Sequence, residues 1–531
     1  MANQCEPTPL SDATALPNGP IPVTRRSDEP AGLIAWLGLA VLALPTLLLG
    51  LDVTILYLAL PALSVELQPS SSQALWIMDA YGFMIAGFLI TMGTLGDRVG
   101  RRRLLMIGAV AFAAASVLAA YSTSAEMLIA ARAALGVAGA TLMPSTLALI
   151  SNLFPNPRQR SLAIGVWATM FALGMAAGPV VGGWLLSHFW WGAAFLIAVP
   201  VVLVLLLAAP LLLPEYRADH REPMDLTSVL LSLAAILPAI HGLKELARHG
   251  PAIEPVLSLV AGILLAMLFV RRQKRLKVPL LDMGLFRRRT FSTALIVLLF
   301  GLIAVGGAML LVTQYLQLVV GLSPLAAGLW MGPPALMMVA AGVTAPLIAR
   351  RLPPGQVVAG ALAFSSLGYL ALFLVGTAPS GLGVAILGFS LVYLGLGTIA
   401  ALGTELVIGA APADKAGSAS AMSEMVQELG VALGVALLGS LSTLIYRLQI
   451  DALLPGELSA DNTAIVEDSL WATVSALDQL SPEIVATAQQ AFTTGLNITA
   501  AASGVAILGL AVLSAVHLRC VQPLGGDDGG H

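Results

Sequence analysis

The sequence predicts an all-α polytopic membrane protein, and its composition carries this prediction. Of its 531 residues, 58% are hydrophobic and only 10% are charged, and the mean hydropathy is +0.91. A soluble domain carries about 25% charged residues, so the composition excludes a soluble globular protein. The apolar residues are also gathered into long runs, each near the length of about 20 residues that a membrane-spanning helix needs.

Fourteen such runs follow a polar, proline-rich segment at residues 1–30. The first run is too long for the core of a signal peptide, so it is kept as the first span. The seventh and eighth are the weakest, because the seventh contains His241 and Lys244. The runs occupy residues 33–60, 75–95, 104–121, 127–150, 162–185, 192–212, 226–244, 254–270, 292–319, 325–348, 357–376, 382–408, 417–445 and 497–517.

Lysine and arginine distinguish the two sides of the predicted membrane. They flank the ends of the chain and follow every second span, with eight of them between residues 271 and 289. The alternate loops hold only Lys244, Arg248 and Arg447. Because basic loops stay on the cytoplasmic side, both termini are expected in the cytoplasm.

One outward loop is long and acidic. Residues 448–495 contain seven Asp and Glu residues and no lysine or arginine. Apolar residues recur at helical spacing on both sides of Ser481-Pro482, which predicts an external helical hairpin. Two interpretations stay open: a solvated flap with a generic acidic face, or a segment that attracts cations or packs on an external gate.

The stretch "GTLGDRVGRRRLL" follows the second span on the cytoplasmic side. Its glycines allow a tight turn and close helix packing, and its acid can pair with an arginine or cap a helix. A plain basic loop is the alternative, but the spacing resembles the signature loop of the major facilitator superfamily. The resemblance implies a breakable latch between two conformations, made by Gly93, Asp97, Arg98, Gly100, Arg101 and Arg102.

Two further stretches resemble motifs of that superfamily. "GMAAGPVVGG" in the fifth span resembles its antiporter signature and places Gly174, Gly178, Pro179, Gly182 and Gly183 in one segment, with the first, second and fourth of these on one helix face. "AARAALGVAGA" in the fourth span contains Arg132, the one basic residue buried in this span. The family links this arginine to proton transfer, and a structural partner for a buried carboxylate is the equal alternative.

The resemblance extends to the fourteen-helix drug:proton antiporters within the superfamily. It covers nearly the whole chain, and residues 49–61, 75–105 and 419–440 carry it most clearly. Many members have Asn at the position of Tyr57, and this difference, with Asp79 and the acidic loop, makes exporters of quaternary ammonium compounds the most similar group. An acid that this group suggests in the tenth span is absent from residues 325–348.

The resemblance implies a major facilitator fold with two six-helix bundles and two inserted helices. The expected parts are a cytoplasmic tail (1–30), an N-terminal half (31–213), the inserted pair (225–271), a C-terminal half (290–518) that includes the external hairpin (448–495), and a second cytoplasmic tail (519–531). The chain is expected to act as a monomer in the bacterial cytoplasmic membrane, with lipids around it. "APLIARRLPPG" at residues 345–355 weakly supports an internal repeat.

Five carboxylates within the spans are candidates for binding protons and cations. Burial raises the pKa of a carboxyl group toward neutral pH, so such a group can exchange a proton, and its ionised form attracts a cation. A purely structural role remains open for each acid. The candidates are Asp52, Asp79, Glu405, Glu424 and Glu428, with Arg132 as their cationic partner, and Tyr57, Trp76, Tyr81 and Trp167 as aromatic faces for a cationic substrate.

These features together predict a proton-coupled exporter of lipophilic cations, dyes and quaternary ammonium compounds. The sequence has no phosphate-binding G-x-x-x-x-G-K-[ST] loop, so a gradient must drive transport. Export of a self-made natural product or metabolite is the alternative, and a membrane-embedded enzyme or sensor is the different class. The histidines and the two cysteines have no metal-binding spacing, and neither a cofactor nor a nucleic acid partner is expected.

Overall fold

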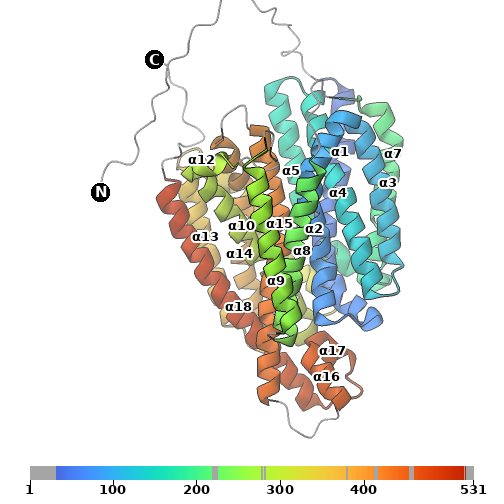
Figure 1. The fold of residues 1–531 in the computed structure, drawn as a ribbon, viewed down its shortest axis with the longest axis vertical. Helices are drawn as coiled ribbons and strands as arrows, with labels where there is room; N and C mark the ends of the chain where they lie inside the picture. Colours follow the sequence, from blue (N-terminus) through green and yellow to red (C-terminus); the bar gives the residue numbers. More distant parts are fainter. Residues whose placement is uncertain are drawn as a thin grey trace, which may run out of the picture.

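The structure is a computed structural model, and it describes residues 31–217, 225–250, 252–276, 279, 283–377, 381–411, 416–453, 460–519 and 521. The expected tail at residues 1–30 and nearly all of the expected tail at 519–531 lie outside the described residues. Within the described residues, fourteen helices are long and apolar enough to cross a membrane, which confirms the predicted number of spans (Figure 1).

The N-terminal part of the fold contains six spans. α3 begins directly after the turn at Gly100, and α6 and α7 together form the sixth span. The helices are α1 (Leu33–Leu67), α2 (Ser71–Val99), α3 (Arg101–Ala120), α4 (Ala125–Leu153), α5 (Pro157–His188), α6 (Ala193–Leu196) and α7 (Ala198–Leu212).

The inserted pair consists of α8 (Leu226–His249) and α9 (Ile253–Gln273). A short 3₁₀ turn, η2 (Leu285–Arg287), leads into the C-terminal part. Its elements are α10 (Arg289–Gln314), the π-helical turn η3 (Tyr315–Val319), α11 (Pro324–Trp330), α12 (Gly332–Ala349), α13 (Pro354–Phe373), α14 (Gly381–Gly409), α15 (Ala416–Leu453), α16 (Ala460–Asp468), α17 (Leu470–Ser475) and α18 (Pro482–His517).

Local sequence explains where several spans begin. Ser70 and Gln73 form a reciprocal capping box at the start of α2, and Ser124 caps α4 by accepting a hydrogen bond from the amide of Met127. Asp225 caps α8 in the same way through the amide of Ser228. A helix leaves its first four amides without partners, so these side chains complete hydrogen bonding where each span begins.

The two parts of the fold pack internally and then against each other. α1 packs on α5 and α2 on α4, while α10 packs on α15 and α13 on both α14 and α18. The parts meet chiefly where α2 contacts α15 and α5 contacts α11. At these seams glycines bring backbones together: Gly82 faces Ala432, and Gly183 faces Pro324.

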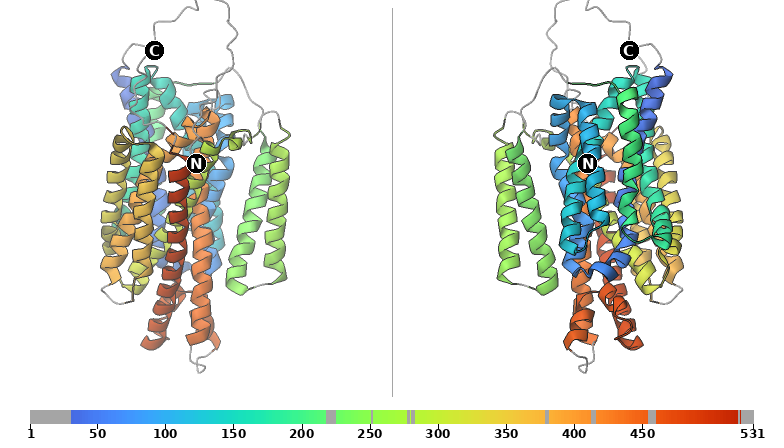
Figure 2. Two further views of the ribbon diagram at one scale, coloured as in Figure 1. Left: turned by 90° about the vertical axis from the view of Figure 1, so that its left-hand side faces the viewer. Right: turned by 90° about the vertical axis from the view of Figure 1, so that its right-hand side faces the viewer.

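The inserted pair stands at one side of the bundle (Figure 2). α8 contacts both α2 and α15, whereas the main contacts of α9 are with α8. Phe83, Ile240, Ala432 and Ala436 form a small buried apolar cluster where the three helices α2, α8 and α15 meet. The pair therefore covers the outside of the α2–α15 seam.

The segment between the last two spans differs in one respect from the expected hairpin at 448–495. α15 continues to Leu453, and α18 begins at Pro482 and runs without a break to His517. The second expected hairpin helix is therefore the outer end of the last span, and α16 and α17 lie between the two long helices. This segment packs on the bundle, because α17 contacts α1 and the Tyr446 hydroxyl donates to the Val466 carbonyl at 2.8 Å.

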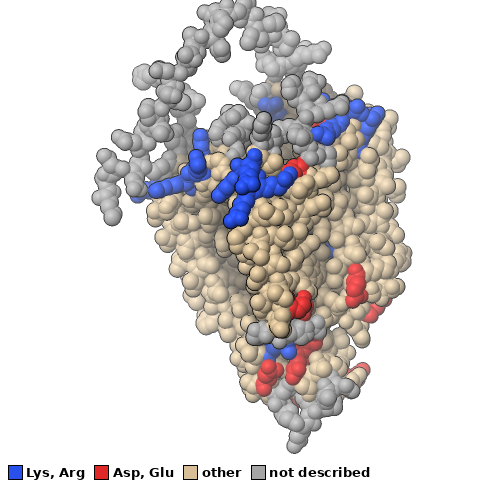
Figure 3. Space-filling model, in the orientation of Figure 1, with Lys and Arg blue, Asp and Glu red and all other residues tan. Residues whose placement is uncertain are grey.

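Charge divides the visible face into zones (Figure 3). Lysine and arginine gather at the end opposite α16 and α17, most acidic side chains lie toward the α16–α17 end, and a broad apolar belt separates the two. Large apolar side chains such as Leu211, 83% exposed, and Ile253, 81% exposed, face outward. An exposed apolar belt of this kind is typical of a surface that contacts the hydrocarbon core of a membrane.

Candidate functional site

Asp52 of α1 and Arg132 of α4 form a buried ion pair. Their side chains are 10% and 2% exposed, and Arg132 Nη1 lies 2.8 Å from Asp52 Oδ2. Arg132 Nε also donates to the carbonyl of Ile77 at 3.2 Å, and its guanidinium lies 4.5 Å from the centre of the Tyr81 ring. Contacts with two other helices, α1 and α2, thus satisfy this arginine, in the manner that a buried cation requires.

Asp79 of α2 and Lys244 of α8 form a second ion pair, and neither side chain has any exposed surface. Lys244 Nζ lies 2.8 Å from Oδ2 and 3.0 Å from Oδ1 of Asp79. The same ammonium lies 3.9 Å from the centre of the Trp76 ring. An acid and an aromatic face are the two elements of a cation site, and here a lysine of the chain itself fills it.

The position of Lys244 corrects the sequence analysis, which ended the seventh span at this residue and counted it with the outward loop. α8 continues to His249, so Lys244 lies within the helix and points at α2. A charge within a span is expensive. Asp79 offsets that cost, and no local sequence pattern reveals a partner 165 positions away.

Glu424 and Glu428 of α15 are half-buried. Among the described residues, neither carboxylate has a hydrogen-bond or ion-pair partner. Glu428 is close enough to Asp52 and to Glu424 to interact with both electrostatically. Glu428 thus lies beside the Asp52–Arg132 pair, and Glu424 lies next to Glu428 on the same face of α15.

The predicted polar stripe of α15 also contacts α14. Ser423 Oγ and Gln427 Nε2 donate to Thr404 Oγ1 at 3.1 and 3.3 Å. The next residue, Glu405, is exposed near the end of α14. The structure therefore groups Asp52, Asp79, Arg132, Glu424 and Glu428, and it leaves Glu405 at the edge of this group.

The four predicted aromatic residues occupy different surroundings. Trp76 and Tyr81 lie under Lys244 and Arg132, so internal cations already cover them. Trp167 donates from Nε1 to Thr146 Oγ1 at 3.0 Å, and Tyr57 is 3% exposed in the core of α1. None of the described His, Cys, Asp and Glu side chains form a group of three that could hold a metal ion.

The loop between α2 and α3 is held by charged contacts within the N-terminal part. Arg101 Nη2 lies 2.7 Å from Asp97 Oδ1, and the backbone amide of Arg101 donates to the carbonyl of Tyr216 at 2.9 Å. Arg102 donates to the carbonyl of Leu213 at 2.9 Å. The partners named here all belong to α2 or to the segment after α7, so these contacts join elements of one half.

Gly100 makes this turn possible. Its φ is +115°, a region that residues with a side chain rarely adopt. A Cβ at Gly100 would also collide with the carboxylate of Glu215, which accepts a hydrogen bond from the amide of Arg102 at 3.1 Å. Gly93 has more room, because a Cβ there would only reach van der Waals distance of Pro144.

The glycine-rich stretch of α5 serves two interfaces. Gly174, Gly178 and Gly182 face α1, where a Cβ would meet the backbone or side chains of Leu47, Thr54 and Ile55. Gly183 faces the backbone of Pro324, and the carbonyl of Pro179 lies against Gly328. One face of the predicted motif therefore packs within the N-terminal part, while its last turn contacts α11 across the seam.

Comparison with known proteins decides the family. The family model described as Major Facilitator Superfamily matches residues 42–435. The chain belongs to the major facilitator superfamily. A multidrug efflux pump, LfrA of Mycolicibacterium smegmatis, is 40% identical over 491 residues, which are 91% of this chain and 96% of that protein.

Two further relatives of this superfamily member are also exporters or resistance proteins. The methyl viologen resistance protein SmvA of Salmonella typhimurium is 35% identical over 490 residues, 90% of this chain and 97% of that protein. The tetracenomycin C resistance and export protein of Streptomyces glaucescens is 33% identical, with 79% and 80% covered. The protein is therefore a membrane transporter related to drug exporters, and it is not an enzyme.

Solved structures agree with the superfamily fold. The structure of a bacterial homologue of the human lysosomal transporter Spinster, inward-facing and occupied, has a TM-score of 0.66 with this chain. The alignment covers 92% of this chain and 98% of that one at 15% identity. At this identity the similarity shows the fold alone, and it confirms the major facilitator architecture expected from the motifs.

Proposed function

We propose that this transporter exports lipophilic cations from the bacterial cytoplasm in exchange for protons. The observation that carries the proposal is an excess of carboxylates at the centre of the fold. Arg132 and Lys244 are each paired with one aspartate, which leaves Glu424 and Glu428 without a cation among the described residues. A carboxylate away from bulk water needs a proton or a cation.

Competition for these two glutamates couples the two fluxes. When Glu424 and Glu428 carry protons, they are neutral and have little attraction for a cation. When a cationic substrate binds, it favours the ionised carboxylates, and the protons leave. Exchange follows if the cation-loaded transporter opens to the outside, where protons replace the released cation, and the protonated transporter then opens to the cytoplasm, where the next cation displaces the protons.

The Asp52–Arg132 ion pair responds to the protonation of Glu428, because Glu428 and Asp52 interact electrostatically. A protonated Glu428 is neutral and leaves Arg132 to Asp52. An ionised Glu428 competes with Asp52 for Arg132. Arg132 connects α1, α2 and α4 through Asp52, Ile77 and Tyr81. A shift of this arginine therefore transmits the loading state to the helix packing.

The number of glutamates suits the energetics of export. Moving one positive charge outward against 100 mV costs about 2.3 kcal/mol, and each entering proton returns about that amount. One-for-one exchange of a monovalent cation is driven by the pH difference alone, at about 1.4 kcal/mol per pH unit. Two carboxylates allow two protons to exchange for one divalent cation. This exchange also moves no net charge, so the pH difference alone drives it.

The proposed orientation places both chain termini in the cytoplasm. The basic zone of Figure 3 supports it, because cytoplasmic loops are enriched in lysine and arginine. Alternating access then requires the two parts to rock about the α2–α15 and α5–α11 seams. In this proposal Asp97, Arg98 and Arg101, beside the turn between α2 and α3, act as the latch when the cytoplasmic side closes.

The names of the relatives support an organic cation as substrate. LfrA is named as a multidrug efflux pump and SmvA as a methyl viologen resistance protein, and methyl viologen is an aromatic dication. The tetracenomycin C exporter favours a second candidate, a largely uncharged aromatic natural product. The unpaired glutamates favour the cation, because a neutral substrate gives them no counterion.

Transport into liposomes distinguishes the two candidates. Purified protein is reconstituted with an internal pH dye, and ethidium, methyl viologen or an uncharged aromatic compound is added. We expect proton movement with the two cations in wild type, its loss in Glu428→Gln, and wild-type behaviour in Asp451→Asn, which alters an exposed acid of the same helix. Proton movement with the uncharged compound alone would replace the first candidate by the second.

A further inference from the structure

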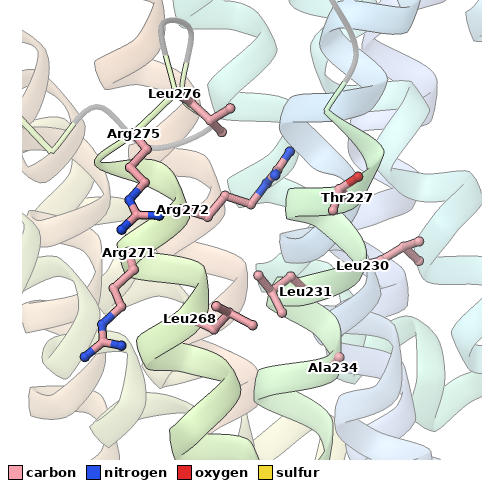
Figure 4. A pocket seen from close by; sticks show the side chains of 9 residues that line it. All are labelled: Thr227, Leu230, Leu231, Ala234, Leu268, Arg271, Arg272, Arg275 and Leu276. Atoms are coloured by element: carbon pink, nitrogen blue, oxygen red, sulfur yellow. The ribbon is translucent and has the colours of Figure 1, made fainter.

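A groove of about 700 Å³ lies between α8 and α9, at the end of the pair that carries the basic residues. Leu230 and Leu231 of α8 and Leu268 of α9 form its apolar wall, and Arg271, Arg272 and Arg275 form its rim (Figure 4). In Figure 4, Leu231 and Leu268 point into the space between the helices, and Arg271 and Arg275 extend to the same side of α9.

The apolar wall of the groove is open to the surroundings. Leu230 is 63% exposed and Leu268 is 52% exposed, although both lie within predicted spans. Since α9 has its main contacts with α8 alone, its other faces lie against the bilayer. Contact of this apolar wall with water is unfavourable, and contact with lipid acyl chains is favourable.

One rim arginine is engaged within the protein. Arg272 Nη2 lies 2.8 Å from Asp225 Oδ1, and Arg272 Nε donates to Ser228 Oγ at 3.0 Å. Burial alone would raise the pKa of Asp225, but the hydrogen bonds from Ser228 and Arg272 outweigh it and hold the pKa below its ordinary value. Asp225 stays ionised and neutralises Arg272, so this part of the rim is structural.

The other two rim arginines keep their charge available. Arg271 and Arg275 are exposed, and neither has a hydrogen-bond or ion-pair partner among the described residues. Lys274, also exposed, lies between them in sequence. The basic patch over this end of α9 is visible in Figure 3. Two free guanidinium groups beside an apolar groove match a ligand with one anionic head and hydrocarbon tails.

We propose that this groove binds an anionic phospholipid of the leaflet on the basic side of the membrane. Arg271 and Arg275 hold the phosphodiester through charge-assisted hydrogen bonds, and an acyl chain lies along Leu231 and Leu268. The same charges exclude a lipophilic cation, so the groove is separate from the transport site. The lipid also fills the space between α8 and α9 and so steadies the pair that carries Lys244.

Lipid retention measured by native mass spectrometry tests the site. The full-length protein is purified in detergent and titrated with phosphatidylglycerol or with phosphatidylcholine of the same chains. We expect wild type to retain phosphatidylglycerol preferentially, and Arg271→Gln/Arg275→Gln to bind it about thirtyfold more weakly, since each of the two arginines near an anionic lipid contributes about 1 kcal/mol. Arg350→Gln/Arg351→Gln, which removes two exposed arginines after α12, serves as the matched control.

Three outcomes would overturn the proposal. They are equal binding of the two lipids by wild type, equal loss in the control variant, and displacement of the lipid by inorganic phosphate at millimolar concentration, which would indicate a site for a free anion. Arg271→Lys/Arg275→Lys keeps the charge and should retain most of the preference. Its retention, with unchanged elution on gel filtration, separates loss of the site from loss of folding.

Discussion

Lys244 in α8 neutralises Asp79 in α2 at a contact of 2.8 Å from which solvent is completely excluded. This pair joins the inserted helices to the N-terminal part by charge, with Trp76 against the ammonium. Toward the C-terminal part, the described contacts of the small α2–α8–α15 cluster are apolar, with Ala432 and Ala436 on α15. Apolar surfaces slide more readily than a buried ion pair separates, so we expect α8 and α9 to move with α2.

Removing Lys244 should destabilise the protein. Lys244→Met leaves the Asp79 carboxylate buried and unpaired, and breaking a buried pair in this way costs about 3–5 kcal/mol. We expect a clearly lower melting temperature in detergent for Lys244→Met and substantial recovery in Asp79→Asn/Lys244→Met. Lys274→Met, at an exposed position, should melt as wild type does. A melting temperature unchanged by Lys244→Met would show that the pair does not anchor α8.

The same pair predicts the effect of Asp79 on transport. Because Lys244 occupies its carboxylate, Asp79 is expected to position α8 without exchanging protons in each cycle. Asp79→Asn/Lys244→Met should then retain substrate-driven proton movement in liposomes, within about threefold of wild type once the reconstituted amount is matched. Complete loss of proton movement in a stable double variant would restore Asp79 as a coupling acid.

Arg132 should not tolerate replacement by lysine. A lysine keeps the charge, but it loses the fixed geometry with which the guanidinium contacts Asp52, Ile77 and Tyr81 at once. We expect Arg132→Lys to reduce transport at least about tenfold, corresponding to about 1.4 kcal/mol. Arg103→Lys, at a side chain that is 62% exposed, should transport normally. Equal activity of the two variants would argue that only charge matters at position 132.

Gly100 should be intolerant of a side chain. At φ +115° an alanine is strained by about 1–3 kcal/mol, and its Cβ meets the Glu215 carboxylate. We expect Gly100→Ala to lower the melting temperature and to weaken the contacts of the α2–α3 loop. Gly165→Ala is the control, because a Cβ there meets open space within a helix. Equal melting temperatures would show that the loop adjusts without cost.

The fold was predictable from sequence to a large extent, while the pairings at the site were not. Long apolar runs and the motif at residues 93–105 indicated fourteen spans and the superfamily, because bilayer thickness and close helix packing impose local patterns. Helix ends were less accessible, as the continuous α18 and the longer α8 show. Asp52 and Asp79 were identified as buried acids and Arg132 as a cationic partner, but the choice of Asp52 by Arg132 and the pairing of Asp79 with Lys244 depend on contacts between distant helices that leave no local signal.

Proton release on substrate binding tests the central claim most directly. Purified protein in weakly buffered detergent solution is mixed with a saturating lipophilic cation such as tetraphenylphosphonium, and a pH indicator counts the protons released. We predict release from wild type and from Asp451→Asn, and none from Glu424→Gln/Glu428→Gln. Binding of the cation to wild type without proton release, or equal release from the double variant, would contradict the claim that these two glutamates exchange protons for substrate.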